Sequence, residues 1–459
     1  MRRTLLLLCL VGVLLQGDRC TVYGQEGSQP RSTDYLILVS VDGFANQMLW
    51  DPQAPMPFLR AQLPNAAVAD EGQICSFPTV TWPNHTTLVT GVAPRVHGVL
   101  ANNVYDRQAR ERLQLIIDPV FDKDELLKVP TLYDVAHEAG LRTAALAWPA
   151  TRQARSLTWC IPDMHVRDGF ARYATPGLLD RFRAAGLPVD RYGPWLSDPT
   201  GGAKRDWLWV EAALKLYERE KPQLLLIHLV EMDHVLHRYG PGSGDDLWVA
   251  TYTDYCLRRL WEGARARLGP DARVTLIISS DHGFFAVTHS IQLGVFFKQQ
   301  FPALKPVIVP QGGSAAIYLP ETSPAQRHAV ASALRRLEGV EEVFEPPAFH
   351  ALGQPTPQES PWAPDLWVAA SEGYSFSASR SGEEIIRRGG RRGTHGFLPH
   401  HEKMRGVFVA FGAGIAEGVK LGKVDNREVA PTAAALLGLE LEHAERPPLR
   451  AALQSTPAH

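Results

Sequence analysis

Alternation of short apolar segments with helical patterns constrains the fold of this chain more than any other feature of its sequence. Five segments have the composition of strands buried on both faces, at residues 35–41, 142–147, 223–230, 274–279 and 407–411. Helical patterns occur at residues 131–139, 207–220 and 429–437. Such alternation is typical of parallel sheets covered by helices on both sides. We therefore expect an α/β fold, a three-layer α/β/α sandwich with a mostly parallel central sheet.

Residues 285–392 have a different composition. Proline- and glycine-rich connections at 306–313 and 355–364 flank a strand pattern at 315–319 and a helical pattern at 324–337. Connections of this kind separate short elements from a regular core. We expect residues 285–392 to form an insertion or cap subdomain.

The N-terminus has the pattern of a secretory signal. Met1-Arg2-Arg3 is a basic start, and the apolar run at residues 5–15 is too short to span a bilayer. A cleavage pattern at 22–24 predicts a signal peptide at residues 1–24, a mature chain at 25–459, and a secreted or periplasmic location. Cys75, Cys160 and Cys256 are expected to be buried thiols with at most one bridge.

Charge excludes some partner classes. The formal net charge is −2 over 459 residues, and no long basic run is present. Nucleic-acid-binding proteins usually carry a basic footprint. We therefore expect no nucleic-acid-binding surface and no membrane span, and the oligomeric state stays open.

Side chains of metal-ligand type lie next to four of the five predicted strands. They are Asp42, Asp233, His237, Asp281, His282 and His395. Because the carboxyl ends of parallel strands share one edge of a sheet, we expect these residues to converge. A set of nitrogen and oxygen ligands, with no CxxC pair, favours a zinc or manganese site that contains no cysteine.

Each candidate has an ordinary alternative when it is taken singly. Asp42 precedes a glycine, which is a common setting for a turn. Asp233 and His237 are four residues apart and could form a surface pair on a helix. Asp281 and His282 could belong to a loop. For the whole set, chance placement beside four strands is a less economical explanation than one shared metal site.

The segment at residues 78–91 supplies a candidate nucleophile. Pro83 suits the first turn of a helix and Gly91 its end, which places Thr81 and Trp82 at the helix N-terminus. Thr81 could cap this helix. The same position offers free N–H groups and a favourable dipole to an alkoxide or a phosphate, provided that a metal activates the hydroxyl.

The order of the motifs VDGF, PTVTWPNH, GVLANNVYD, DHVLH, SSDHGF and GTHGF resembles that of the nucleotide pyrophosphatase/phosphodiesterase family of the alkaline phosphatase superfamily. The motifs extend from about Asp34 to Gly396, and weaker similarity continues to about Leu437. The resemblance implies an alkaline-phosphatase-like fold. It also implies a two-zinc hydrolase that cleaves phosphodiester or pyrophosphate bonds of a small-molecule or nucleotide substrate through a covalent phospho-threonine.

The resemblance assigns roles to individual residues. One zinc ion would be bound by Asp233, His237 and His395, and the second by Asp42, Asp281, His282 and the Thr81 hydroxyl oxygen. Asn102 would donate to a phosphate oxygen together with the Thr81 N–H group. Thr79 is expected to tolerate replacement by alanine. His85 and the other histidines outside the ligand positions are expected to be core, surface or supporting residues.

The sequence departs from the family at two positions. Trp82 stands where phenylalanine is frequent and would keep an aromatic face for substrate. His165 stands where a tyrosine often completes a base clamp, so the leaving group is open between nucleotide, lipid head group and others. The alternatives are a phosphonate hydrolase or phosphomonoesterase of the same superfamily, and a catalytically silent binding protein on this fold.

Overall fold

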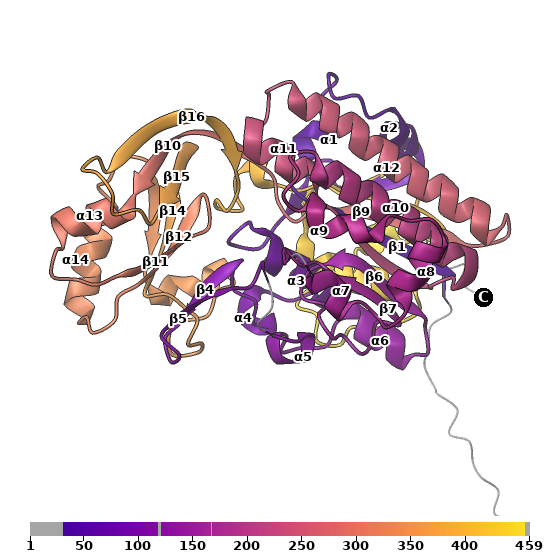
Figure 1. Ribbon diagram of the computed structural model, residues 1–459, viewed down its shortest axis with the longest axis horizontal. Helices are drawn as coiled ribbons and strands as arrows, with labels where there is room; N and C mark the ends of the chain where they lie inside the picture. The colour runs from indigo at the N-terminus through magenta and orange to yellow at the C-terminus, as the bar shows by residue number, and fades with distance from the viewer. Residues whose placement is uncertain (1–30, 118–120, 167, 455–459) are drawn as a thin grey trace, which may run out of the picture.

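An eight-stranded sheet forms the centre of the molecule, in a computed structural model that describes residues 31–117, 121–166 and 168–454 (Figure 1). Its strand order is β18-β2-β17-β9-β1-β8-β6-β7. Five neighbouring strands run parallel: β9 (Val274–Ser279), β1 (Tyr35–Val41), β8 (Leu224–Leu229), β6 (Thr143–Trp148) and β7 (Trp159–Pro162). Four of these match predicted strands to within one residue at each end. The prediction of a mostly parallel α/β fold is confirmed.

The fifth predicted strand runs in the opposite direction. It is β17 (Phe408–Gly412), which pairs antiparallel with β9 and with β2 (Ala66–Val68), and β18 (Val419–Lys420) completes this side. Because β17 is antiparallel, its first residue, Phe408, pairs with Ser279 at the end of β9. The residues before β17 therefore reach the edge where the parallel strands end.

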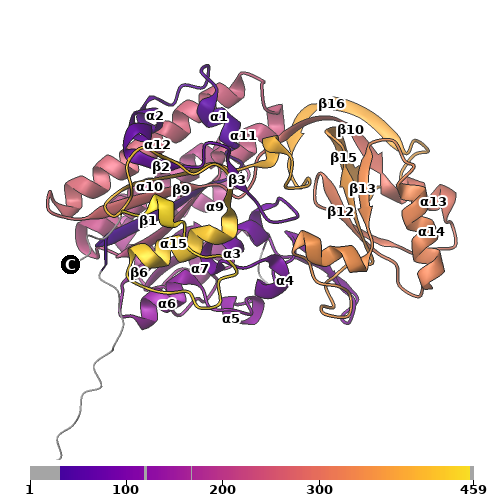
Figure 2. The same ribbon diagram turned by 180° about the vertical axis from the view of Figure 1, so that it is seen from behind.

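Helices cover both faces of the central sheet. On one face, Ile37 and Val39 pack with α10 (Gly201–Arg219) and α12 (Asp245–Leu268), which Figure 1 shows. On the other face, Leu36 and Leu38 pack with α3 (Thr81–Thr90), α6 (Leu132–Glu138) and α15 (Val429–Leu436), seen in Figure 2. The alternation of β1 side chains between two apolar layers is the three-layer arrangement that was predicted.

Local signals explain how well the helices were predicted. Thr131 caps α6, since its hydroxyl accepts a hydrogen bond from the Asp134 N–H at 3.2 Å. Helix α10 begins six residues before the predicted start, because Gly201 and Gly202 in its first turn are poor helix formers and conceal the pattern. The 24-residue helix α12 was not predicted.

Residues 285–394 form two smaller sheets beside the core (Figure 1). One contains β15 (Gly373–Ser377), β10 (Phe285–Gln292) and β16 (Ile386–Thr394), and the other contains β11 (Val307–Pro310), β12 (Ser314–Tyr318), β14 (Leu366–Ala370) and β13 (Val340–Phe344). Helices α13 (Leu293–Gln300) and α14 (Pro324–Leu334) share an apolar cluster with them. A separate cluster joins Trp367 and Tyr318 of this region to Phe77 and Trp82 of the core.

The remaining predictions concern the termini and cysteines. The predicted signal peptide lies outside the described residues. Cys75, Cys160 and Cys256 are buried and free, so none of these three cysteines forms the bridge that the sequence had left open. Among the helices of the described ranges, none combines the length and apolar character needed to cross a membrane.

Candidate metal centre and nucleophile

The six predicted metal ligands meet at the edge of the sheet where β1, β8 and β9 end. They are Asp42 directly after β1, Asp233 and His237 one turn apart on α11 (Glu231–Tyr239), Asp281 and His282 just after β9, and His395 directly after β16. The first five residues reach this edge because they follow the parallel strands β1, β8 and β9. The sixth, His395, reaches it in the segment that leads into the antiparallel strand β17. The convergence expected from the sequence is therefore present.

Asp42, Asp281 and His282 form a buried group. His282 Nε2 lies 3.3 Å from Asp42 Oδ1 and 3.2 Å from Asp281 Oδ2. The other oxygen of Asp281 accepts hydrogen bonds from the Gly43 N–H and the His282 N–H, each at 3.1 Å. Gly43 has a φ of +74°, and a Cβ there would lie 2.5 Å from the Phe284 ring, so only glycine can provide this N–H. Asp281 Oδ2 is thereby directed into the group.

Asp233, His237 and His395 form an adjoining, more open group. Asp233 Oδ1 lies 3.3 Å from His237 Nε2 and 3.7 Å from His395 Nε2, and the two imidazole nitrogens are 3.1 Å apart. The rings of His282 and His395 stack with centroids 3.7 Å apart, so His282 lies beside both groups. The His237 side chain is 41% exposed while that of His282 is fully buried, which means that the site opens to solvent at this group.

Polar atoms at the centre lack hydrogen-bond partners within the protein. Asp42 Oδ1, Asp233 Oδ1, Asp281 Oδ2 and His282 Nε2 are all buried, and none forms a hydrogen bond with another described residue. Buried polar atoms are normally paired, because leaving one unpaired costs about 1–3 kcal/mol. Carboxylate and imidazole atoms that face one another in this way suit a cation between them. The side chains fit metal ions, and a mixed nitrogen and oxygen set fits zinc.

Burial shifts the ionisation of these side chains. Burial, helped by the charge of Asp233, raises the pKa of Asp281 to about 7. Burial and the charge of Asp281 raise the pKa of Asp42 well above its usual value. Burial also lowers the pKa of His395 to about 4, with a further contribution from His237. The His395 imidazole is therefore neutral near pH 7 and can offer a lone pair to a metal.

Thr81 is the first residue of α3, as predicted, and it lies next to the buried group. The N-cap is Val80, and no side chain caps this helix, so Thr81 is not the capping residue. His85 Nδ1 lies 2.9 Å from the Thr81 carbonyl oxygen and 3.6 Å from Asp281 Oδ2, which ties the helix start to the metal ligands. Asn102 Oδ1 accepts a hydrogen bond from the Trp82 N–H at 2.8 Å. The nitrogen of the Asn102 amide is then the end that can serve a substrate oxygen.

His228 was absent from the candidates that the sequence provided. Its Nε2 lies 3.1 Å from Asp42 Oδ2, and its Nδ1 lies 3.0 Å from the Ala147 carbonyl oxygen. The ring is also 4.2 Å from that of His85. A signal was available, because a histidine within the apolar run LLLIHL must find a polar partner when the strand is buried. His228 therefore orients Asp42, and its neighbour His85 contacts Thr81 and Asp281.

Thr79 has more contacts than its sequence position suggested. Its hydroxyl donates to the Phe397 carbonyl oxygen at 3.0 Å and accepts from the Gly396 N–H at 3.1 Å. Its carbonyl oxygen lies 3.0 Å from His395 Nδ1. Thr79 therefore holds the segment that carries His395, and its hydroxyl is already engaged.

Trp82 differs from the expectation of a substrate-facing ring. Its side chain is fully buried and packs in the cluster that includes Phe77, Leu100 and Trp367. From the start of α3 the ring points toward the insertion, where it packs against apolar side chains instead of facing solvent. In this structure Trp82 offers no exposed face for stacking.

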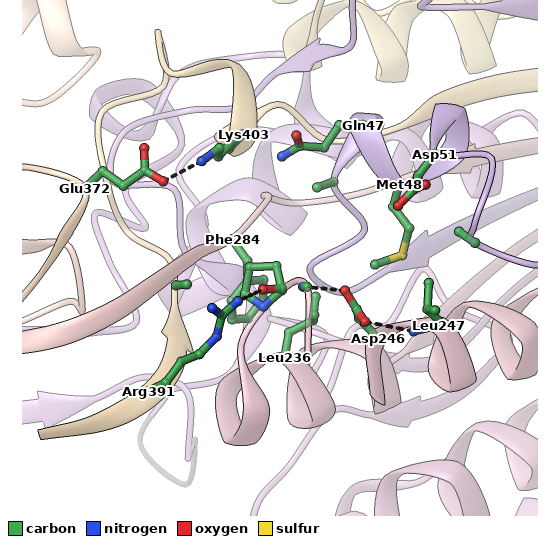
Figure 3. Close-up of a pocket in the computed structure, with 15 residues that line it drawn as sticks. Gln47, Met48, Asp51, Leu236, Asp246, Leu247, Phe284, Glu372, Arg391 and Lys403 are labelled. Atoms are coloured by element: carbon green, nitrogen blue, oxygen red, sulfur yellow. Dashed lines mark hydrogen bonds and ion pairs between the residues drawn. The ribbon is translucent and has the colours of Figure 1, made fainter. Parts of the chain in front are cut away.

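A cavity of about 550 Å³ has Phe284 in its lining, and Figure 3 shows this ring among the other lining side chains. Phe284 lines the cavity, and its ring centroid is 5.0 Å from that of His237 and 5.3 Å from that of His395. None of the nine predicted site residues lines the cavity. Phe284 thus separates this cavity from the candidate metal centre.

Comparison with known proteins identifies similar sequences. The family model described as "Type I phosphodiesterase / nucleotide pyrophosphatase" matches residues 36–398. An uncharacterized pyrophosphatase/phosphodiesterase of Schizosaccharomyces pombe is 28% identical over 54% of this chain and 44% of its own length. Ectonucleotide pyrophosphatase/phosphodiesterase family member 1 of Rattus norvegicus is 23% identical over 88% of this chain and 40% of its own length. The chain therefore spans less than half the length of these two relatives.

Solved structures show a similar fold. Murine ectonucleotide pyrophosphatase/phosphodiesterase 5 superimposes with a TM-score of 0.67 at 20% sequence identity, over 89% of this chain and 96% of the murine chain. One structure of that murine protein is an inactive threonine-to-alanine variant in complex with AMP.

Proposed function

Since the chain belongs to the type I phosphodiesterase / nucleotide pyrophosphatase family, we propose that it is a two-zinc hydrolase of phosphodiester or pyrophosphate bonds with Thr81 as its nucleophile. The observation that carries the proposal is the set of buried, unpaired ligand atoms beside the start of α3. Asp233, His237 and His395 would hold one ion, and Asp42, Asp281, His282 and Thr81 the other. Zinc is favoured over calcium and magnesium because both groups contain imidazole.

Two bound zinc ions would lower the pKa of the attacking hydroxyl and stabilise the charge that develops on the leaving oxygen. The Thr81 oxygen would attack phosphorus in line with the leaving group and form a covalent phospho-threonine. Asn102 would donate its amide N–H to a non-bridging oxygen, together with the Thr81 N–H at the positive end of α3. Water would then attack phosphorus, and the two inversions would give net retention.

The proposed substrate is a small molecule with a phosphodiester or pyrophosphate bond, and a nucleotide is one candidate for the part that carries the phosphorus. A nucleotide is supported by the AMP complex of the murine relative. A base clamp that uses Trp82 is not supported, because that ring is buried. We propose that residues 285–392 belong to the same catalytic domain at 25–459, since Trp82 and Trp367 share one apolar cluster.

The experiment is a comparison of kcat/KM for bis-(p-nitrophenyl) phosphate and p-nitrophenyl phosphate, combined with elemental analysis of protein purified without chelator. A diester is expected to be preferred, because the side chain proposed to meet its non-bridging oxygens, Asn102, is neutral, whereas enzymes that accept a doubly charged monoester commonly add an arginine. About two zinc equivalents are expected, one for each ligand group. A clear preference for the monoester would refute the diesterase assignment. Full activity without metal would refute the mechanism.

A further inference from the structure

Glu341, His400 and His401 form a second cluster of metal-ligand side chains, outside the six-ligand site. His401 Nε2 lies 2.9 Å from Glu341 Oε2, and His400 Nε2 lies 3.4 Å from Glu341 Oε1. One ligand atom from each of the three residues lies within 4.8 Å of the others. The two imidazole rings are 4.2 Å apart.

The cluster joins two different parts of the fold. Glu341 lies on β13, which is an edge strand of the four-stranded sheet in the insertion. His400 and His401 lie in the segment that leads from His395 back to β17 in the central sheet. Neighbouring residues of an extended segment point in opposite directions, yet here both rings reach the same carboxylate. The local turn before the 3-10 helix (Glu402–Met404) makes this possible.

Ordinary His–Glu ion pairs in this protein look different. His350 pairs with Glu359 at 2.8 Å, and no second imidazole shares that carboxylate among the described residues. Glu341 faces two imidazole nitrogens, one at each of its oxygens, and neutral imidazoles can donate to it as their Nε2–H tautomers. The same three residues bring one ligand atom each within 4.8 Å of the others, so they can instead bind a divalent cation when both nitrogens offer their lone pairs.

We propose that Glu341, His400 and His401 bind a zinc ion that is separate from the catalytic site. Two histidines and one glutamate are a ligand set that zinc accepts, with water in the open position. The His400 side chain is 65% exposed, so water can reach that position. The proposal goes beyond the hydrolase function and does not depend on it.

The location gives this ion a structural consequence. The segment that it would hold packs against the residues that follow β9, through hydrogen bonds from the Gly283 N–H to the Met404 carbonyl oxygen and from the Phe284 N–H to the Lys403 carbonyl oxygen. The His401 ring contacts the Phe285 ring edge to face, with centroids 5.2 Å apart. A bound ion holds β13, the edge strand of the insertion that carries Glu341, against the segment that also carries His395.

Zinc stoichiometry tests the proposal. The full-length chain is dialysed to equilibrium against a series of buffered free zinc concentrations, and zinc per chain is measured by elemental analysis. His401→Ala and Glu341→Gln are each expected to bind one equivalent less than the wild type. His350→Ala, which removes an exposed imidazole from an ordinary ion pair, is expected to match the wild type. Because the result is a difference between variants, it holds whatever number of ions the catalytic site takes.

Two results would overturn the proposal. One is an equal zinc content in the wild type and both cluster variants. The other is an equivalent lost from His350→Ala as well, because zinc would then bind exposed imidazoles in general. Circular dichroism checks the fold of each variant. His400→Ala, at the most exposed of the three side chains, provides the same measurement should either of the others fail to fold.

Discussion

The chemistry proposed here depends on the surroundings of a few single atoms. Thr81 begins a helix without being its cap, so no capping bond occupies its hydroxyl. The ring of His85 connects the same residue to Asp281, and Asn102 is fixed by its oxygen. Each of these contacts leaves a reactive or donor atom available. The residues around Thr81, the proposed nucleophile, therefore hold its position without occupying its hydroxyl.

Thr81→Ala is expected to reduce turnover of bis-(p-nitrophenyl) phosphate by at least about 10³-fold, because loss of a nucleophile removes the covalent route. Zinc content should stay at the wild-type level, since the carboxylates and imidazoles remain. Thr90→Ala is the matched control, because Thr90 is buried at the other end of α3 and, among the described residues, its hydroxyl bonds only the Thr86 carbonyl oxygen, at 2.8 Å. Comparable losses in the two variants would exclude a special role for Thr81.

His228→Leu is expected to weaken zinc binding by about 10- to 100-fold, because Asp42 loses the imidazole that orients it. The measurement is competition with a chelating dye. His97→Leu serves as the control, since His97 is also fully buried but bonds Thr87 instead of a metal ligand. Both variants should lose stability, and only the first should lose zinc affinity. If the two bind zinc alike, His228 is merely a core residue.

At the scale of elements, packing of the segment before α3 distinguishes Thr79, whose hydroxyl is hydrogen-bonded, from Thr81. Residues 78–81 contact the segment that follows β16. Thr79 binds that segment with its hydroxyl and its carbonyl oxygen. His395 is held at the candidate metal centre by its contact with Thr79, in the segment that leads to the antiparallel strand β17. These contacts favour a different prediction from the tolerance of alanine that the sequence suggested at Thr79.

Thr79→Val is expected to lower kcat about 10- to 100-fold and to weaken zinc binding, because the segment that carries His395 loses two hydrogen bonds. Thr79→Ser, which keeps the hydroxyl, should restore both properties. Parallel zinc titrations and rate measurements distinguish this effect from that of Thr81→Ala, in which zinc is retained. Wild-type behaviour of Thr79→Val would restore the view that the residue is dispensable.

At the scale of the whole molecule, the fold buries an ionisable carboxyl group and so makes the free energy of unfolding depend on pH. The ordinary pKa of an aspartate carboxyl is 3.8, and burial raises the pKa of Asp281 to about 7 in the absence of metal. The unfolded chain releases this proton near pH 4, whereas the folded protein keeps it until about pH 7. The contribution of Asp281 to stability is therefore full below about pH 4 and falls as the pH rises through this range.

Metal-free wild-type protein should consequently lose stability relative to Asp281→Asn between pH 5 and pH 8, as measured by the midpoint of urea unfolding. Zinc requires the carboxylate form, so added zinc should stabilise the wild type more at pH 8 than at pH 5. Asp254→Asn is the control for the effect of zinc, because Asp254 is a buried carboxyl outside the candidate metal site and is held by the N–H groups of Phe58 and Leu59. Identical pH profiles for wild type and Asp281→Asn in the absence of metal would contradict the buried, protonated state.

The sequence alone was sufficient for five of the eight strands of the central sheet, for the positions of α3, α6, α10, α14 and α15, and for the convergence of the six candidate ligands. Apolar periodicity and the polar residues next to each strand are local features. The sequence predicted the start of α3 from Pro83 and Gly91 for the same reason. Only the tertiary structure could turn the Trp82 ring into the core, pair His228 with Asp42, and engage the Thr79 hydroxyl with the segment after His395. Each of these contacts joins residues far apart in the chain, and its partner is set by the direction in which distant strands run. Local patterns carry no information about that direction.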